Sequence, residues 1–220
     1  MATLVARQGR HRQLYEDNRR LVSGCIPYRF REGCEDCECR EEDCLEVLMI
    51  SSPNRHDLVF PKGGWENDES VHEAACREAF EEAGVKGNLN TTELGVWEFR
   101  SKSTQAISSL EGGCRGYMFA LEVTEELDSW PEQENHARNW LNIRDAFRLC
   151  RYDWMREALG AFLELMENDR HQPNTTNNNQ MTLTTTTTIM PDRQVPKAAS
   201  ANRSINSTAI IAIAFAIVTP

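Results

Sequence analysis

Three glutamates and one arginine crowd into the segment from Arg77 to Glu82, at a spacing that can hold a metal ion. Residues four apart lie one turn apart on the same side of a helix, so Glu78 and Glu82 are predicted to point the same way. Carboxylate oxygens are the ligands that Mg²⁺ prefers, and a stacked pair of them can reach one cation. The segment therefore predicts a divalent-metal site on one face of a helix, with Glu81 at the edge of that face.

Small apolar residues share this face when the segment is turned at about 100° per residue. Like charges among core-facing residues are costly unless a positive charge lies between them. Mg²⁺ or Mn²⁺ would remove that cost, and small side chains would leave room for a hydrated ion. The glutamates alone are also typical of an acidic stripe that faces water, so both interpretations stand at this point. The small residues are Val71, Ala74, Ala75 and Ala79.

The acidic segment belongs to a predicted helix over residues 68–83, which ends at Gly84, a residue suited to the left-handed position after a helix. Runs rich in β-branched and aliphatic residues predict strands, and two later periodic runs predict helices. The order of these elements indicates an α/β domain with one helix among the strands and one or two at the end. The strands cover residues 21–30, 45–51, 94–101 and 116–123, and the later helices cover 143–150 and 153–166.

The 220 residues are predicted to form one domain with a tail at each end. We expect a flexible basic segment over residues 1–18, the domain over 19–167, and a disordered low-complexity tail over 168–220. The net charge of −10 argues against a nucleic-acid polymer as partner, whereas a small anionic substrate suits the local basic clusters. The apolar run over 209–218 is shorter than the about 20 residues that span a membrane, so no stable membrane insertion is expected.

The first residues bear on the compartment. No apolar signal segment opens the chain, so a cytoplasmic or nuclear location is expected. Several arginines and no acid precede Glu16, which leaves a mitochondrial location as the alternative. The sequence makes no prediction of the oligomeric state.

A longer pattern surrounds the glutamates in the segment GGWENDESVHEAACREAFEEAGV. This segment resembles the Nudix box, G-x5-E-x7-R-E-U-x-E-E-x-G-U with U apolar, at every fixed position. A motif with that many charged and glycine positions is far more specific than a short glycine-rich pattern. The resemblance implies a Nudix-type α/β/α sandwich with a mixed sheet. The fixed charged and glycine residues are Gly63, Glu69, Arg77, Glu78, Glu81, Glu82 and Gly84.

The resemblance also implies a metal-dependent hydrolase of phosphoanhydride bonds. Glu78 and Glu82 would be ligands of Mg²⁺ or Mn²⁺, and Gly63 would bring backbone carbonyls near the ion. The ion would polarise a phosphoryl oxygen and lower the pKa of bound water, which makes in-line attack feasible at neutral pH.

The remaining matched residues would have catalytic roles. Glu81 would be a further metal ligand or the base that deprotonates water. Arg77 would hold the acids in place by ion pairing, and Glu69 would support that network. Spacing alone does not distinguish which glutamate is the base.

From about Arg19 to Met166 the chain resembles the diphosphoinositol polyphosphate and diadenosine polyphosphate phosphohydrolase branch, particularly its plant members. Such enzymes bind highly anionic substrates through basic residues around the box. His136 stands where the resemblance to the inositol-pyrophosphate enzymes leads us to expect an arginine, so that substrate is not singled out. Diphosphoinositol polyphosphates, dinucleoside polyphosphates and other nucleoside diphosphate-linked substrates therefore stand as alternatives. The candidate substrate-binding residues are Lys62, Gly64, Arg55, Arg20, Ser52 and Arg115.

Two other classes of protein compete with the hydrolase. A Nudix-fold binding module would recognise a polyphosphate without cleaving it, but such a module does not need the intact charged cluster. An adaptor built on a zinc loop would use the cysteines from Cys34 to Cys44, although the acidic residues around them disfavour thiolates.

Overall fold

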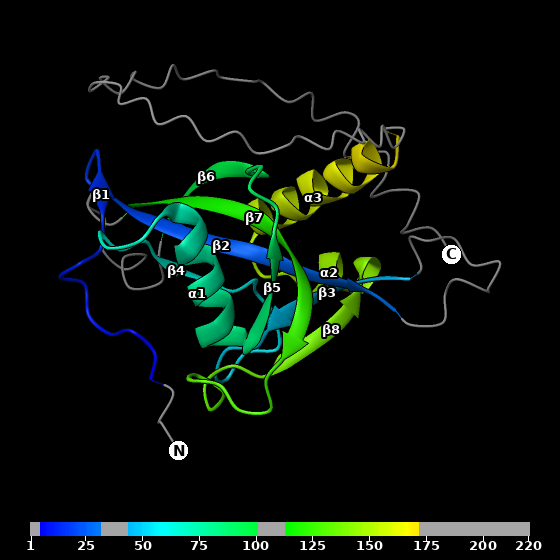
Figure 1. The fold of residues 1–220 in the computed structure, drawn as a ribbon, viewed down its shortest axis with the longest axis horizontal. Coiled ribbons are helices and arrows are strands. Elements are labelled where there is room, and N and C mark those ends of the chain that lie inside the picture. The colour runs from blue at the N-terminus through cyan, green and yellow to red at the C-terminus, as the bar shows by residue number, and fades with distance from the viewer. Residues whose placement is uncertain (1–4, 32–43, 101–112, 172–220) are drawn as a thin grey trace, which may run out of the picture. The chain divides into compact units, whose positions relative to one another are not determined.

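The computed structural model describes residues 5–31, 44–100 and 113–171. Within these residues one mixed sheet of eight strands is accompanied by three helices (Figure 1). The first of the two compact units of the chain, Met1–Asp169, contains the whole sheet. In chain order the elements are β1 (Tyr15–Glu16), β2 (Arg19–Phe30), β3 (Leu45–Ile50), β4 (Lys62–Gly64), α1 (Val71–Ala83), β5 (Val85–Leu89), β6 (Gly95–Arg100), β7 (Gly113–Glu126), β8 (Arg138–Asn142), α2 (Ile143–Leu149) and α3 (Asp153–His171).

Strand β2 is the centre of the sheet because it pairs with β7 on one side and with β3 on the other. The β2–β7 pair is parallel, so the chain must cross over between these strands, and α1 lies on that connection. Strand β4 pairs with the first half of β2, with Gly63 opposite Ser23. This pairing holds the glycine pair of the motif against the central strand.

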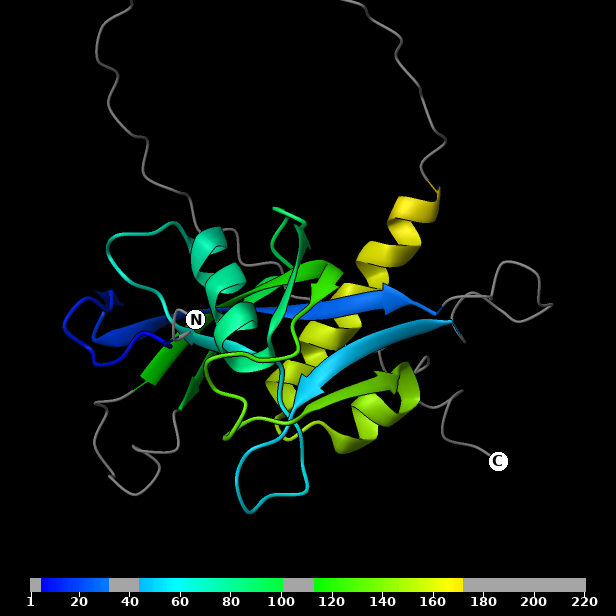
Figure 2. The same ribbon diagram turned by 60° about the horizontal axis from the view of Figure 1, so that its bottom comes forward.

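Helices cover both faces of the sheet (Figure 2). Side chains alternate between the two faces along a strand, so residues an odd number apart point in opposite directions. On β2, the hydroxyl of Ser23 donates to the carbonyl of Val71 in α1 at 2.7 Å. The ring of Tyr28 packs on Phe162 in α3, with 5.1 Å between ring centroids. The structure therefore confirms the predicted α/β/α sandwich.

Helix α1 begins and ends at local sequence signals. The hydroxyl of Ser70 accepts from the N–H of Glu73 at 3.2 Å, and the carboxylate of Glu73 accepts from the N–H of Ser70 at 2.7 Å. This capping box places the first helical residue at Val71, three residues after the predicted start. Gly84 ends the helix as predicted, with a φ of 62°. A Cβ there would lie 2.7 Å from the ring of Trp130. Glycine is therefore required both by the left-handed backbone conformation and by the lack of space for a side chain.

The predicted strands correspond to β2, β3, β6 and β7, and the later helices correspond to α2 and α3. The sequence does not predict β1, β4, β5 and β8, because these short strands form by pairing with longer neighbours. Helix α3 continues to His171, beyond the predicted end at Met166. Residues 32–43, with most of the cysteine cluster, and the tail from residue 172 lie outside the described residues. No described helix has the length and hydropathy that a membrane span needs.

Candidate active site

The acids of α1 lie on the side of the helix that faces the sheet. Glu78 and Glu81 are only 7% and 6% exposed, and Glu82 is partly buried. The alanines on the same arc are buried as predicted and Val71 is partly buried, because the helix packs closely on the strands beneath it. The acidic segment is therefore not a stripe that faces water. The fully buried small residues are Ala74, Ala75 and Ala79.

The backbone at Gly63 lies directly against the buried acids. A Cβ built on Gly63 would be 2.2 Å from the carboxylate of Glu78, so no other residue fits without moving that side chain. The neighbouring N–H of Lys62 donates to Glu82 at 2.8 Å. Strand β4 thus forms a cradle of main-chain groups around the two carboxylates.

Arg77 connects the acids into one network. Its guanidinium donates to both oxygens of Glu69, at 2.9 and 2.7 Å, and to the carbonyl of Gly64 at 2.9 Å. It also donates to Glu78 at 2.6 Å and to Glu81 at 3.2 Å. The planar fork of arginine suits such multiple contacts, and Arg77 is itself almost buried.

The charges in this network do not balance. Burial, and then the neighbouring carboxylate of Glu82, raise the pKa of Glu78 from 4.5 to about 8, against the opposite effect of Arg77. Burial also raises the pKa of Glu81 and Glu82. A divalent cation between Glu78 and Glu82 would supply the missing positive charge. The carboxylate oxygens and the main-chain cradle fit Mg²⁺ or Mn²⁺.

The raised pKa of Glu78 predicts that the metal-free protein loses stability as the pH rises. The folded state keeps this proton up to about pH 8, whereas the unfolded chain releases it near pH 4.5. The folded state therefore binds more protons in that window, and the free energy of unfolding falls across it. We expect the metal-free Tm to fall from about pH 5 to about pH 8, and Mg²⁺ or Mn²⁺ to reverse the fall.

Thermal unfolding followed by circular dichroism, with a chelator and with each metal, measures this effect. The variant Glu78→Gln is the matched control, because an amide carries no titrating proton. It should reduce the pH dependence, while the raised pKa values of Glu81 and Glu82 keep part of it. A metal-free Tm that rises over the same window would contradict the prediction.

The N-terminal segment reaches the same acids. The backbone N–H of Arg7 donates to Glu81 at 3.0 Å, and its guanidinium pairs with Glu66 at 2.8 Å and Asp68 at 2.9 Å. The sequence predicts a flexible segment over residues 1–18, whereas its described part makes these specific contacts. The physical reason is that Arg7 provides a second positive charge for the acidic loop before α1.

A cavity of about 240 Å³ lies beside the acids, and Glu82 forms part of its wall. Three of the predicted substrate-binding residues, Arg20, Ser52 and Lys62, line it. The cavity combines several positive charges with aromatic rings, which suits an anionic ligand that carries an apolar or aromatic part. Its wall also includes residues that the sequence does not assign to the substrate, among them Phe99, Arg100, His136, Arg151 and Tyr152.

The other predicted substrate residues lie outside this lining. The guanidinium of Arg55 donates to both oxygens of Asp57, at 2.8 and 2.7 Å. Arg115 forms ion pairs with Glu16 and Glu98. Gly64 contributes its carbonyl to Arg77 instead of facing the cavity. The charges of both arginines are thus compensated within the protein.

Some of the cavity residues that the sequence does not assign to the substrate lie in segments that the sequence analysis does single out. Arg151 and Tyr152 belong to CRYDWM, one of the segments that carry the family resemblance. Arg100 belongs to a local basic cluster with Arg115. Neither segment indicates which of its side chains face the cavity, because that depends on strand pairing and helix packing.

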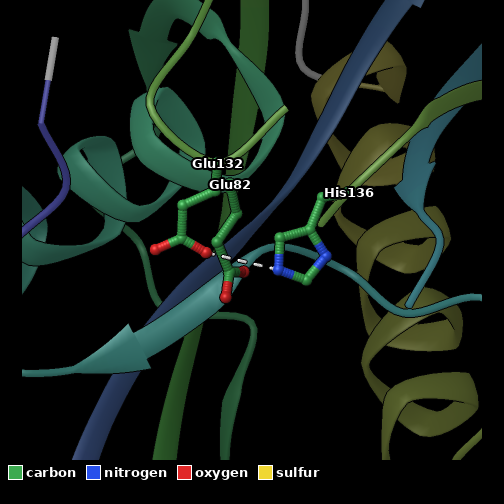
Figure 3. Close-up of side chains that lie close together, drawn as sticks. All are labelled: Glu82, Glu132 and His136. Atoms are coloured by element: carbon green, nitrogen blue, oxygen red, sulfur yellow. Dashed lines mark ion pairs between the residues drawn. The ribbon is translucent and has the colours of Figure 1, made fainter. Parts of the chain in front are cut away.

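The loop between β7 and β8, residues 127–137, brings Glu132 and His136 beside Glu82 (Figure 3). The loop is tied to the end of α1, since the N–H of Glu132 donates to the carbonyl of Glu81 at 3.0 Å. The indole of Trp130 donates to the carbonyl of Glu82 at 3.2 Å. One ligand atom from each of the three side chains in Figure 3 lies within 4.8 Å of the others.

Comparison with known proteins agrees with this geometry. The model of the NUDIX domain matches residues 38–162. Nudix hydrolase 12, mitochondrial, from Arabidopsis thaliana is 61% identical over 173 residues, which cover 77% of this chain and 85% of the relative. Diphosphoinositol polyphosphate phosphohydrolase 2 from Mus musculus is 34% identical over 125 residues, covering 56% of this chain and 63% of the relative.

A solved structure shows the same fold. The crystal structure of a C. elegans Ap4A hydrolase binary complex superposes with a TM-score of 0.51 at 19% identity, covering 67% of this chain and 98% of that chain. The sandwich, the buried acid network and these matches define a Nudix hydrolase. The chain belongs to the Nudix family.

Proposed function

We propose that the chain hydrolyses a phosphoanhydride bond in a small polyphosphorylated substrate, with Mg²⁺ or Mn²⁺ held by Glu78 and Glu82. The observation that carries this proposal is that the carboxylate of Glu82 raises the pKa of Glu78 in the buried acid network and also forms part of the wall of the basic cavity. A phosphate bound in the cavity would therefore lie next to the metal ligands. A non-catalytic binding module would gain nothing from carboxylates whose burial costs stability.

Each part of the site would then have a defined task. The bound metal would stabilise charge on a phosphoryl oxygen and lower the pKa of a bound water. Lys62 and Arg20 would hold phosphate oxygens from the cavity wall. Arg77 would keep Glu78 oriented, and Glu81 would act as a further ligand or as the base that accepts the proton of the attacking water.

The aromatic side of the cavity bears on the substrate class. Phe99 and Tyr152 line the cavity, and Phe99 stacks on Trp154 with 4.5 Å between ring centroids and 11° between the planes. Aromatic rings bind a nucleobase by stacking, whereas an inositol ring has no π face. These contacts favour a dinucleoside polyphosphate. The basic lining and the name of the mouse relative support a diphosphoinositol polyphosphate as the second candidate.

A substrate panel tests the proposal. We expect kcat/KM to be highest for diadenosine polyphosphates among these, inositol pyrophosphates, ADP-ribose, NADH and nucleoside triphosphates, with Mg²⁺ and Mn²⁺ compared. Tyr152→Ala should raise KM for the diadenosine compounds by about tenfold, from the loss of one stacking contact. Tyr15→Ala, at an exposed tyrosine outside the cavity, is the matched control.

Two results would contradict the proposal at different levels. A higher kcat/KM for inositol pyrophosphates, with KM unaffected by Tyr152→Ala, would replace the substrate class. Failure to cleave any phosphoanhydride with either metal would overturn the hydrolase itself.

Similar proteins and the first residues bear on the compartment. Two Arabidopsis thaliana relatives, each 61% identical, are named mitochondrial. Together with the arginines that precede Glu16, these names favour the mitochondrial alternative over a cytoplasmic or nuclear location, and we propose it for this chain.

A further inference from the structure

We propose that Arg151 binds the phosphate next to the nucleoside of the substrate, and that Asp57 is a positioning residue that orients Arg151 for this contact. Arg151 lies in the cavity wall between α2 and α3, and Asp57 lies in the segment between β3 and β4. Neither residue belongs to the Nudix box. The inference rests on the proposed function, because it takes the ligand of the cavity to be a nucleoside polyphosphate.

One edge of the Arg151 guanidinium is held by Asp57. Its Nε donates to Oδ1 of Asp57 at 2.8 Å, and its Nη2 donates to the main-chain carbonyl of Asp57 at 3.2 Å. A guanidinium has five N–H donors in one plane, so the opposite edge, with Nη1, keeps its donors. Within the described residues no other acceptor binds this group, although the side chain is only 5% exposed. A donor away from water without an acceptor is costly, so this free edge suits an acceptor that arrives with the ligand.

The main chain fixes the position from which the Arg151 side chain extends. The N–H of Arg151 donates to the carbonyl of Leu58 at 2.9 Å, and the N–H of Leu58 donates to the carbonyl of Leu149 at 2.9 Å. Leu58 and Cys150 are buried, and they form a parallel bridge between the two segments. A side chain with a fixed backbone and one fixed edge loses little conformational freedom when a ligand binds. Its contact with an anion is therefore preorganised.

The charge of Arg151 is only partly compensated. Arg55 donates to both oxygens of Asp57, at 2.8 and 2.7 Å, so two guanidiniums share one carboxylate. Arg55, and then Arg151, hold the pKa of Asp57 well below its usual range, so this carboxylate stays ionised at neutral pH. On the same cavity, Nε of Arg20 is buried and has no acceptor in the described part of the chain. Phosphate oxygens are the acceptors that an arginine edge binds in pairs, which makes a phosphate the fitting ligand.

The neighbour of Arg151 in the sequence indicates which phosphate it meets. Tyr152 also lines the cavity, and the guanidinium of Arg151 lies 5.6 Å from the centroid of its ring. Lys62, by contrast, lies beside the metal ligands, because its N–H donates to Glu82. A nucleobase stacked on Tyr152 would therefore place its first phosphate at Arg151, while a later phosphate reaches Lys62 and the metal. Arg151 would thus anchor a part of the substrate that does not react.

Binding of adenosine and of adenosine 5′-monophosphate (AMP), measured by NMR titration with a chelator present, tests this contact. The parent should bind AMP more tightly than adenosine, and equal affinities would overturn the proposal. Arg151→Gln should weaken AMP by about 10- to 100-fold, the usual loss for hydrogen bonds to a charged group, and leave adenosine unchanged. A purely structural role would weaken both ligands, because a disturbed wall also displaces Tyr152. Arg148→Gln, at an exposed arginine of α2, is the matched control and should change neither affinity.

The role of Asp57 is tested by a double-variant cycle on AMP binding. Asp57→Asn should weaken AMP by about threefold to tenfold, because the amide lacks the charge that holds the guanidinium. The double variant Asp57→Asn with Arg151→Gln should bind AMP as Arg151→Gln alone does. A further loss equal to that of Asp57→Asn would show that Asp57 acts elsewhere, which overturns its positioning role. Arg151→Lys, which keeps the charge but not the edge, provides the same comparison if Arg151→Gln does not fold, and parent-level AMP affinity in it would overturn the role of the edge.

Hydrolysis separates this inference from the proposed function. Arg151→Gln should raise KM for diadenosine polyphosphates and leave kcat close to that of the parent, the pattern for a contact made equally before and during the reaction. A fall in kcat at unchanged KM would place Arg151 at the reacting phosphate and overturn the anchor. A parent that cleaves its substrate, with AMP affinity unchanged in Arg151→Gln, would overturn the anchor and leave the proposed function intact. The expected binding pattern in a parent that cleaves no phosphoanhydride would support the anchor and overturn the hydrolase.

Discussion

Replacement of Glu82 by glutamine is expected to lower kcat by at least about 10³-fold, which is typical for loss of a group on which the chemical step depends. Glu82 borders the cavity and accepts from the N–H of Lys62, so it lies where a bound phosphate would meet the metal. Glutamine keeps an oxygen that can accept this hydrogen bond but lacks the negative charge that holds the cation. Steady-state hydrolysis of the best substrate from the panel, at saturating metal, measures the loss.

The same variant should fold at least as well as the parent without metal. Removal of one carboxylate from a buried cluster relieves repulsion with Glu78, so the metal-free Tm should stay level or rise. Glu125→Gln is the matched control, because Glu125 is exposed at the end of β7 and its pair with Lys86 is also exposed. Activity of Glu82→Gln within tenfold of the parent, with normal folding, would refute the role assigned to Glu82.

Replacement of Arg77 by methionine is expected to reduce the free energy of unfolding by about 3 to 5 kcal/mol, the usual cost when one partner of a buried ion pair is removed. Arg77 is 12% exposed and bonds Glu69, Glu78 and Glu81, so its loss leaves several buried carboxylates uncompensated. Arg77→Lys should lose less, because an ammonium retains the charge but not the planar set of donors.

Chemical denaturation without metal above about pH 8, where Glu78 is ionised, measures this loss of stability. The loss should shrink as the pH falls, because Glu78 and Glu81, whose pKa values are raised, then take up protons. Arg12→Ala removes an exposed ion pair with Asp68 and is the control, with an expected change within about 1 kcal/mol. A loss below about 1 kcal/mol for Arg77→Met would show that the acids do not depend on this guanidinium.

The local properties of the chain determined helix α1 and its boundaries. Ser70 and Glu73 form the capping box, and Gly84 takes the left-handed conformation that the sequence predicts at the end of the helix. The spacing of Glu78 and Glu82 also predicts their common direction, because it follows from the helical repeat alone. The inward face and the need for a cation could be argued from these residues before any tertiary contact was known.

The partners of this helix were decided only by the tertiary structure. The approach of Gly63 to Glu78 depends on β4 pairing with β2, which no local pattern of three residues predicts. The contact of Arg7 with Glu81 joins residues 74 positions apart in a segment that the sequence indicates as flexible. This contact is a hydrogen bond from the backbone N–H of Arg7, and the guanidinium of the same residue pairs with Glu66 and Asp68. Contacts of this kind have no periodicity along the chain.

The residues that line the cavity were also decided only by the tertiary structure. Arg20, Lys62 and Arg151 come from β2, β4 and the turn before α3, and only the packing of these elements brings them to one wall. Arg55 and Arg115 have the same charge but lie outside the cavity lining, and Asp57 pairs with both Arg55 and Arg151. The sequence by itself determined the helix, its acids and the family, since these depend on neighbours along the chain. The tertiary structure alone decided which distant side chains meet those acids, since that depends on strand order, loop anchoring and the pairing of charges.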